Sequence, residues 1–175
     1  MVMKSDFIPA VQERVARVAV SASAARGQGK GTVKAAREYL STLGLHQFGV
    51  RNETKYLMRL EDATDALYKV LPKQSRSWGL ARKLINIFLR DALYTTYLAE
   101  KYRLGAAEPF FEIPLDSITS KHLRKDAGRG VLPRWKGVKH LAADDSERYQ
   151  SQAEIIGQKR GIYRVHLDTY WWGQR

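Results

Sequence analysis

The sequence has 175 residues, of which 44% are hydrophobic, so it can form one compact domain with a core of its own. It contains no cysteine, which excludes disulfides, thiolate nucleophiles and cysteine-ligated zinc or iron–sulfur centres. Its formal net charge is +12 at pH 7. No window of 18 uninterrupted apolar residues occurs and the first residues lack a signal-peptide pattern, so we expect an intracellular, cytoplasmic protein without a membrane partner.

The first half of the chain predicts helices over residues 8–25, 32–43 and 52–70, from apolar residues at helical spacing. Asn52 is a favoured residue for the N-cap of the third. The connector R-G-Q-G-K-G at residues 26–31 contains Gly-Lys, but the glycine after it stands where a phosphate-binding P-loop needs Ser or Thr. We therefore expect no nucleotide site there.

A long central helix is predicted next, from about Gly79 to Tyr102. Its apolar residues cover too much of the circumference for a surface helix, so it should pass through the protein. Lys83, Asn86 and Arg90 stand at i, i+3 and i+7, which predicts that they share one narrow polar stripe.

The last third predicts an extended approach through Pro114, followed by a helix from Asp116, as N-cap, to about Lys125. A further helix is predicted from Asp145 to about Gly157. The ending V-H-L-D-T-Y-W-W predicts a short helix or turn that docks one tryptophan into the core. No alternating strand pattern or repeat occurs, so the expected class is all-α, with residues 1–70 and 71–175 forming one unit.

The positive charge is concentrated in two windows. Residues 71–90 hold five cations and no acid, and residues 121–140 hold seven cations and one acid. This predicts a binding face for a polyanion rather than an evenly solubilising surface, the alternative being two solvated basic helices. The candidate DNA-binding residues are Lys73, Arg76, Trp78, Gly79, Arg82, Arg124, Lys125, Arg129, Arg134, Lys136 and Lys139.

Four segments carry a resemblance to a known family. They are G-L-A-R-K from Gly79, F-L-R from Phe88, I-P-L-D-S-I from Ile113 and H-L-D-T-Y-W from His166. Together with the helix–turn–helix layout near Leu71, they resemble the helix-hairpin-helix DNA glycosylases, which include endonuclease III and the 8-oxoguanine glycosylase/lyases. The pattern is most similar to the archaeal-type 8-oxoguanine glycosylases and covers residues 71–175.

This resemblance implies a base-excision repair enzyme that flips out and removes a modified base, an oxidised purine first among the candidates. Lys83 corresponds to the nucleophile that attacks the sugar and forms an imine, and Asp116 to the carboxylate that stabilises the sugar cation. It further implies double-stranded DNA with a damaged base as the partner, no metal or cofactor, a monomer and association with the nucleoid. For this chemistry the pKa of Lys83 must be lowered, by burial or by the cations Arg76 and Arg82.

Several alternatives stay open at the level of sequence. Asp168 is a second candidate carboxylate, or it caps the last turn or pairs with an arginine such as Arg164. Ala81 stands where the family hairpin carries a glycine, which suits a helical DNA-binding protein without activity. A glycosylase for a phage-type modified base is another alternative. Trp78 and Trp135 could each stack on a base or simply pack. The four histidines are scattered, so no metal site is expected.

Overall fold

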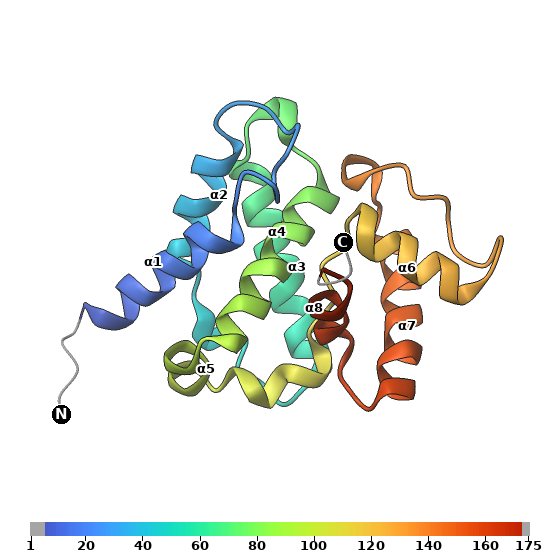
Figure 1. Ribbon diagram of the computed structural model, residues 1–175. Coiled ribbons are helices and arrows are strands. Elements are labelled where there is room, and N and C mark those ends of the chain that lie inside the picture. Colours follow the sequence, from blue (N-terminus) through green and yellow to red (C-terminus); the bar gives the residue numbers. More distant parts are fainter. Residues whose placement is uncertain (1–5, 173–175) are drawn as a thin grey trace.

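The computed structural model describes residues 6–172, and within them every regular element is helical and none is a strand (Figure 1). The all-α prediction is confirmed. The α-helices are α1 Phe7–Ala19, α2 Thr32–Ser41, α3 Glu53–Val70, α4 Trp78–Tyr94, α5 Thr96–Tyr102, α6 Ser117–Ala127, α7 Ala143–Arg160 and α8 Leu167–Trp172. Short 3-10 helices lie between them: η1 Leu45–Gln47, η2 Lys73–Ser75, η3 Leu104–Phe110, η4 Val138–His140 and η5 Arg164–His166. Of these, no helix is long and apolar enough to cross a membrane.

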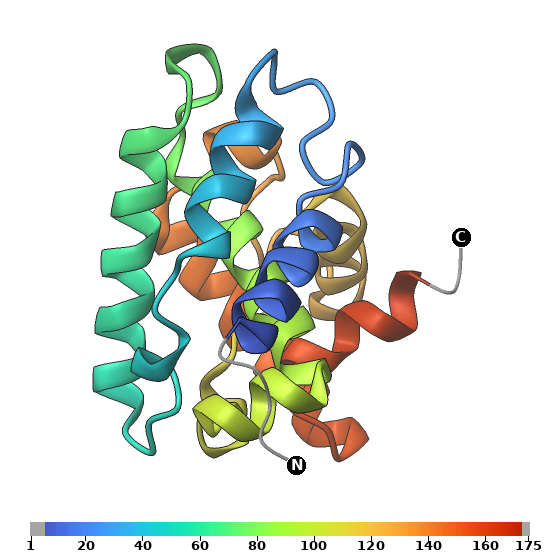
Figure 2. The ribbon, with the colours of Figure 1, turned by 90° about the vertical axis from the view of Figure 1, so that its left-hand side faces the viewer.

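Helix α4 runs through the middle of the protein, as predicted, with α1 and α3 packed along it (Figure 2). Leu84, Ile85 and Phe88 are completely buried in its central turns. The predicted single helix is in fact two, because Thr95 has an extended backbone and its hydroxyl donates to the backbone oxygen of Asp91 at 2.8 Å. The chain turns there and continues as α5.

Two hydrophobic clusters form the core. The first is built mainly by α1 to α5 and η3, and includes Tyr56 and Phe88. The second is built by α6, α7, α8 and the segments next to them, and includes Tyr149 and Trp171. Along the chain, the first cluster reaches Phe111 and the second begins at Ile113, on either side of Glu112, while Val165 returns to the first. Trp171 is 4% exposed, which confirms that one C-terminal tryptophan docks into the core.

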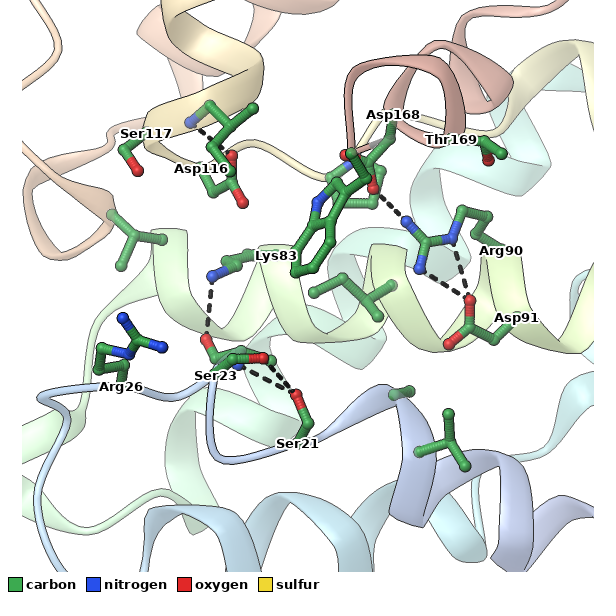
Figure 3. A pocket seen from close by; sticks show the side chains of 18 of the residues that line it. Ser21, Ser23, Arg26, Lys83, Arg90, Asp91, Asp116, Ser117, Asp168 and Thr169 are labelled. Carbon is green, nitrogen blue, oxygen red and sulfur yellow. Dashed lines mark hydrogen bonds and ion pairs between the residues drawn. The ribbon is translucent and has the colours of Figure 1, made fainter. Parts of the chain in front are cut away.

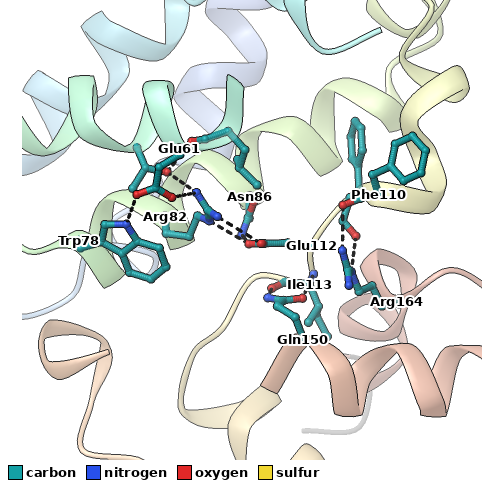
Figure 4. A network of polar contacts seen from close by, with 12 residues as sticks. Glu61, Trp78, Arg82, Asn86, Phe110, Glu112, Ile113, Gln150 and Arg164 are labelled. Carbon is teal, nitrogen blue, oxygen red and sulfur yellow. Dashed lines mark hydrogen bonds and ion pairs between the residues drawn. The ribbon is translucent and has the colours of Figure 1, made fainter. Parts of the chain in front are cut away.

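A buried polar network joins the two clusters across one side of α4 (Figure 4). Arg82 forms ion pairs at 3.0 Å with Glu112 and with Glu61, and Asn86 donates to Glu112 at 2.9 Å. Asn86 therefore faces this network, and the predicted stripe of Lys83, Asn86 and Arg90 is wrong for Asn86. The reason is angular: on a helix of 3.6 residues per turn, Asn86 lies about 60° from Lys83, on the side of Arg82.

Helix boundaries follow the capping residues more closely than the hydrophobic pattern. Asn52 accepts from the backbone N–H of Lys55 at 2.8 Å, which confirms it as the N-cap of α3. Asp116 caps α6, also as predicted. Helix α1 stops at Ala19, six residues before its predicted end, and residues 20–31 cross the surface as a connection that we call the α1–α2 loop.

Candidate active-site cavity

A cavity of about 780 Å³ opens beside α4, on the side away from the polar network (Figure 3). The α1–α2 loop forms one wall, and the start of α6 and the start of α8 form another. A third side is formed by residues 135–138, which lead into η4. Helix α4 supplies one continuous face to this cavity, made of Lys83, Ile87, Arg90, Asp91 and Tyr94.

Lys83 extends from α4 into this cavity. Its Nζ donates to the backbone oxygen of Ala24 in the α1–α2 loop at 2.9 Å. Burial lowers the pKa of Lys83 below the usual value for lysine, while the charges of Asp116 and Asp168 act in the opposite direction. The predicted lowering by burial is borne out, whereas the cations Arg76 and Arg82 are not among its causes.

Asp116 lies across the cavity from Lys83, at the head of α6 (Figure 3). Its Oδ1 accepts from the backbone N–H groups of Ile118 at 2.8 Å and Thr119 at 2.9 Å, and Thr119 in turn accepts from the backbone N–H of Asp116. This reciprocal capping fixes the carboxylate at the N-terminus of α6. The predicted N-cap is thus confirmed, and the same residue lines the cavity.

Asp168, at the start of α8, is the third ionisable group of the site. It is 2% exposed, forms an ion pair with Arg90 through Oδ2, and leaves Oδ1 without a hydrogen-bond partner in the described part of the chain. Burial raises the pKa of the Asp168 carboxyl to about 6, although Arg90 lowers it. The predicted pairing with an arginine is confirmed, but the partner is Arg90 and not Arg164, which donates to the backbone oxygens of Phe110 and Phe111.

Sequence reasoning did not identify the opposite wall. Ser21, Ser23, Ala24 and Arg26 line the cavity from the α1–α2 loop, where part of a helix was predicted. Asp91 was also missed; it lies about 80° around the helix from Lys83, on the side opposite to Asn86, next to Ile87. The glycines correctly indicated the connector at residues 26–31, and the error lies in residues 20–25, which were predicted to be helical.

Most candidate DNA-binding cations are exposed, and none of the candidate cations is among the residues that line the cavity. Lys73 and Arg76 are in or next to η2, Arg124 and Lys125 end α6, and the others follow α6. The two basic windows meet, since Lys139 Nζ donates to the backbone oxygen of Gln74 at 3.2 Å. Trp135, in the second window, lines the cavity. The exposed cations among the candidate DNA-binding residues are Lys73, Arg76, Arg124, Lys125, Arg129, Arg134, Lys136 and Lys139.

The remaining candidates lie away from the cavity. Arg82 is 7% exposed and held by two glutamates, and its guanidinium lies 5.0 Å from the centre of the Trp78 ring. The Trp78 indole N–H donates to Glu61 at 2.8 Å. Gly79 is buried, and a Cβ there would overlap the backbone oxygen of Val138. These three residues hold the interior and η4 together, so their contacts favour packing over DNA binding.

Among residues 6–172 there is no group of histidine and acidic side chains that could hold a metal ion. No protein-family model matches the sequence, and neither a curated protein sequence nor a solved structure matches it. The function must therefore be argued from the cavity alone. Chemically, the cavity combines a lysine of lowered pKa, an oriented carboxylate and a buried acid. Exposed cations lie on segments next to its lining residues in the sequence.

Proposed function

We propose that this protein is a DNA glycosylase that removes a modified base, foremost an oxidised purine, and nicks the strand through an imine formed by Lys83. The observation that carries the proposal is Lys83 itself: an amine of lowered pKa, opening on a cavity that also contains Asp116 and Asp168. A lysine is nucleophilic only when it is neutral, so a lowered pKa is what such a reaction needs.

The surroundings of the cavity support a polyanionic substrate. Exposed cations of the segment after α6 flank the cavity-lining Trp135 and Val138 in the chain, others lie in or next to η2 and at the end of α6, and phosphate groups bind to surfaces of this kind. A base inside a duplex cannot reach a cavity, so the nucleotide has to be flipped out of the stack. The volume of about 780 Å³ is within the range of pockets that hold small organic groups.

The proposed chemistry uses three groups of this chain. The neutral amine of Lys83 attacks C1′ of the flipped nucleotide, the bond from C1′ to the base breaks, and the base leaves with the bonding electrons and takes up a proton. Asp116 stabilises the positive charge that develops on the sugar. Ring opening gives the imine, and loss of a C2′ proton then expels the 3′ phosphate. Asp168 stays near, as a carboxyl that can hold a proton near pH 6.

The proposal is tested by borohydride trapping on duplexes that contain 8-oxoguanine, uracil or an abasic site. The imine is reduced to a stable amine, so we expect a covalent protein–DNA product whose modified peptide contains Lys83. Lys83→Gln should lose the product entirely and keep its DNA affinity. Lys55→Gln is the matched control, because Lys55 is an exposed lysine on α3 away from the cavity.

Two results would contradict the proposal. A product that persists in the Lys83→Gln variant would assign the nucleophile to another amine. If no duplex gives a product or releases a base while binding stays tight, the protein is a helical DNA-binding protein without this activity. A set of duplexes with phage-type modified bases, run in the same assay, separates a special substrate from an absent activity.

A further inference from the structure

We propose that Gln74 is a positioning residue for Lys83, which it controls through the α1–α2 loop, residues 20–31. This rests on the proposed function only in that Lys83 is the reactive amine. Gln74 does not contact Lys83, and neither Gln74 nor its loop contacts Gly29 and Lys30 are among the residues that line the cavity. Its effect is transmitted by the loop. Ala24 of the loop accepts a hydrogen bond from Lys83, and Lys30 near the end of the loop accepts one from Gln74.

At the cavity, the loop supplies the only hydrogen-bond acceptor of Lys83 recorded among the described residues, the backbone oxygen of Ala24. This hydrogen bond fixes the direction of one N–H of the amine, and it thereby orients the other N–H bonds and, in the neutral amine, the lone pair. The Ala24 peptide is itself held in place, because its N–H donates to Ser21 Oγ at 3.2 Å, and Ser21 Oγ lies 2.8 Å from Ser23 Oγ. The loop thus orients Lys83 and covers it.

At its other end, the loop is attached to the η2 turn. Gln74 Nε2 donates to the backbone oxygen of Lys30 at 3.0 Å. Gly29, beside it, packs so closely that a Cβ would lie 3.0 Å from Gln74 Cγ. The backbone oxygen of Gln74 accepts from Lys139 of η4. Gln74 therefore links the loop to the point where the two basic windows meet.

The second part of the loop, residues 26–31, is suited to move if this link is lost. Gly27, Gly29 and Gly31 all have positive φ, at 74°, 91° and 87°, which other residues rarely adopt. Between residues 20 and 31 the loop contains no α-helix to stiffen it. The buried Val20 and Ala25 hold its first part, whereas residues 26–31 are exposed or half-buried, and such segments open with small free energies. Removal of the Gln74 amide should therefore loosen this part of the loop and expose more of Lys83 to the water of the cavity.

Exposure of Lys83 to water would change its protonation in a predictable direction. The groups that face it are Asp116 of α6, Asp168 of α8, the paired Arg90 and Asp91 of α4, and Arg26 of the loop. The two carboxylates raise the pKa of Lys83 and burial lowers it. If burial is lost while the carboxylates stay, the pKa rises, and less of the amine is neutral at pH 7.

The direct test needs no DNA. Lys83 in the folded protein is labelled with a trace of isotopic acetic anhydride across a pH series, and its labelling is read by peptide mass spectrometry. Gln74→Ala should shift the titration of Lys83 to higher pH. Gln152→Ala is the matched control, since its amide donates to Asp126 on the α6–α7 surface and has no part in the loop. An unchanged Lys83 titration in Gln74→Ala would overturn the proposal.

A second pair of variants tests the same contact from the loop. Gly29→Ala places a methyl group against Gln74, whereas Gly27→Ala meets no atom within 4 Å and introduces backbone strain alone. We expect the shift for Gly29→Ala to exceed that for Gly27→Ala. Equal shifts would attribute the effect to backbone strain and remove Gln74 from the explanation.

The trapping assay then connects the inference to the reaction. Gln74→Ala should slow imine formation on an abasic-site duplex about threefold at pH 7, the size expected for one exposed hydrogen bond, and the rate should recover at higher pH. Recovery with pH is the sign of an amine whose protonation has changed. If the wild type is never trapped, the proposed function fails, but the labelling experiment still decides whether Gln74 positions Lys83.

Discussion

Arg82 and Lys83 are neighbours in the sequence and cations of the same helix, but the structure surrounds them in opposite ways. Arg82 is enclosed by Glu61, Glu112 and Thr64, which satisfy its guanidinium at 2.9 to 3.3 Å. Lys83 has one backbone oxygen as its acceptor and two carboxylates that act on it electrostatically. One side of α4 therefore carries a paired ionic network, and the other faces the large cavity.

This comparison separates a charge that holds the fold from a charge that is available for chemistry. A buried arginine with matched carboxylates is neutralised and fixed, and its removal leaves the partner charges unpaired. A lysine without a carboxylate contact is incompletely compensated, so its protonation is sensitive to burial. A variant on one side of α4 should leave the other side unchanged, and the unchanged side then serves as an internal control.

The largest effect is expected for Arg82→Ala on the side of the ionic network. It leaves Glu112, which is 7% exposed, with Asn86 as its remaining partner, and a broken buried pair costs about 3 to 5 kcal/mol of the free energy of unfolding. Chemical denaturation at pH 7 measures it. The double variant Arg82→Met, Glu112→Leu should recover most of this loss. A single variant as stable as the wild type would show that the network does not hold the two core clusters together.

On the cavity face, Asp168→Asn should change how stability depends on pH. Burial raises the pKa of Asp168 in the folded protein to about 6, whereas in the unfolded chain the carboxyl has its ordinary pKa of 3.8. Stability from this group is therefore present at low pH and is lost as pH rises from 4 to 6, by a free energy on the order of 3 kcal/mol. The variant should flatten that part of the curve in thermal or denaturant unfolding. An unchanged slope between pH 4 and 6 would contradict the assignment.

The same variant, Asp168→Asn, should also lower the pKa of Lys83. The charge of Asp168 raises the pKa of Lys83, so its removal should let imine trapping begin at a lower pH. Arg82→Lys, on the side of the ionic network, should leave that pH profile unchanged. A profile that moves with Arg82 and not with Asp168 would mean that the two faces of α4 are coupled.

Gly79→Ala tests how η4 packs against the start of α4. The added methyl group would overlap the Val138 backbone oxygen and lie 2.7 Å from Leu141 Cβ, so the two segments must separate. We expect a loss of about 1 to 3 kcal/mol, as for other overpacked sites. Gly105→Ala, where no atom lies within 4 Å, is the matched control. Equal stability of the two variants would contradict the close packing.

The smallest effect is expected at the surface. Lys136→Ala and Lys139→Ala should weaken DNA binding of every sequence similarly and lower its dependence on salt by about one unit of slope per lost phosphate contact. Fluorescence anisotropy over a salt series measures this. Lys34→Ala, on α2, is the control for the loss of one exposed charge. An unchanged slope in both lysine variants would place the DNA elsewhere.

The sequence predicts the helices of this protein and their caps better than the residues that line its cavity. The N-caps Asn52 and Asp116 and the buried helix α4 follow from local rules, because each depends on neighbours within a few residues. Ala24 could not be predicted, because its role is carried by a backbone oxygen that any residue would supply. Arg82 was assigned to DNA from its position in a basic window. Its carboxylate partners come from Glu61 and Glu112, 21 and 30 residues away, which no local pattern indicates.

The ion pair of Arg90 with Asp168 joins residues 78 positions apart, and the contact of Lys83 with Ala24 joins residues 59 apart. Contacts of such separation require closure of long loops, so they form late compared with local contacts such as the packing of α3 on α4. A folding intermediate that already contains α3 and α4 would therefore still lack the cavity. In such an intermediate, Lys83 would be an ordinary solvated amine, and its lowered pKa would arise only once these distant contacts have formed.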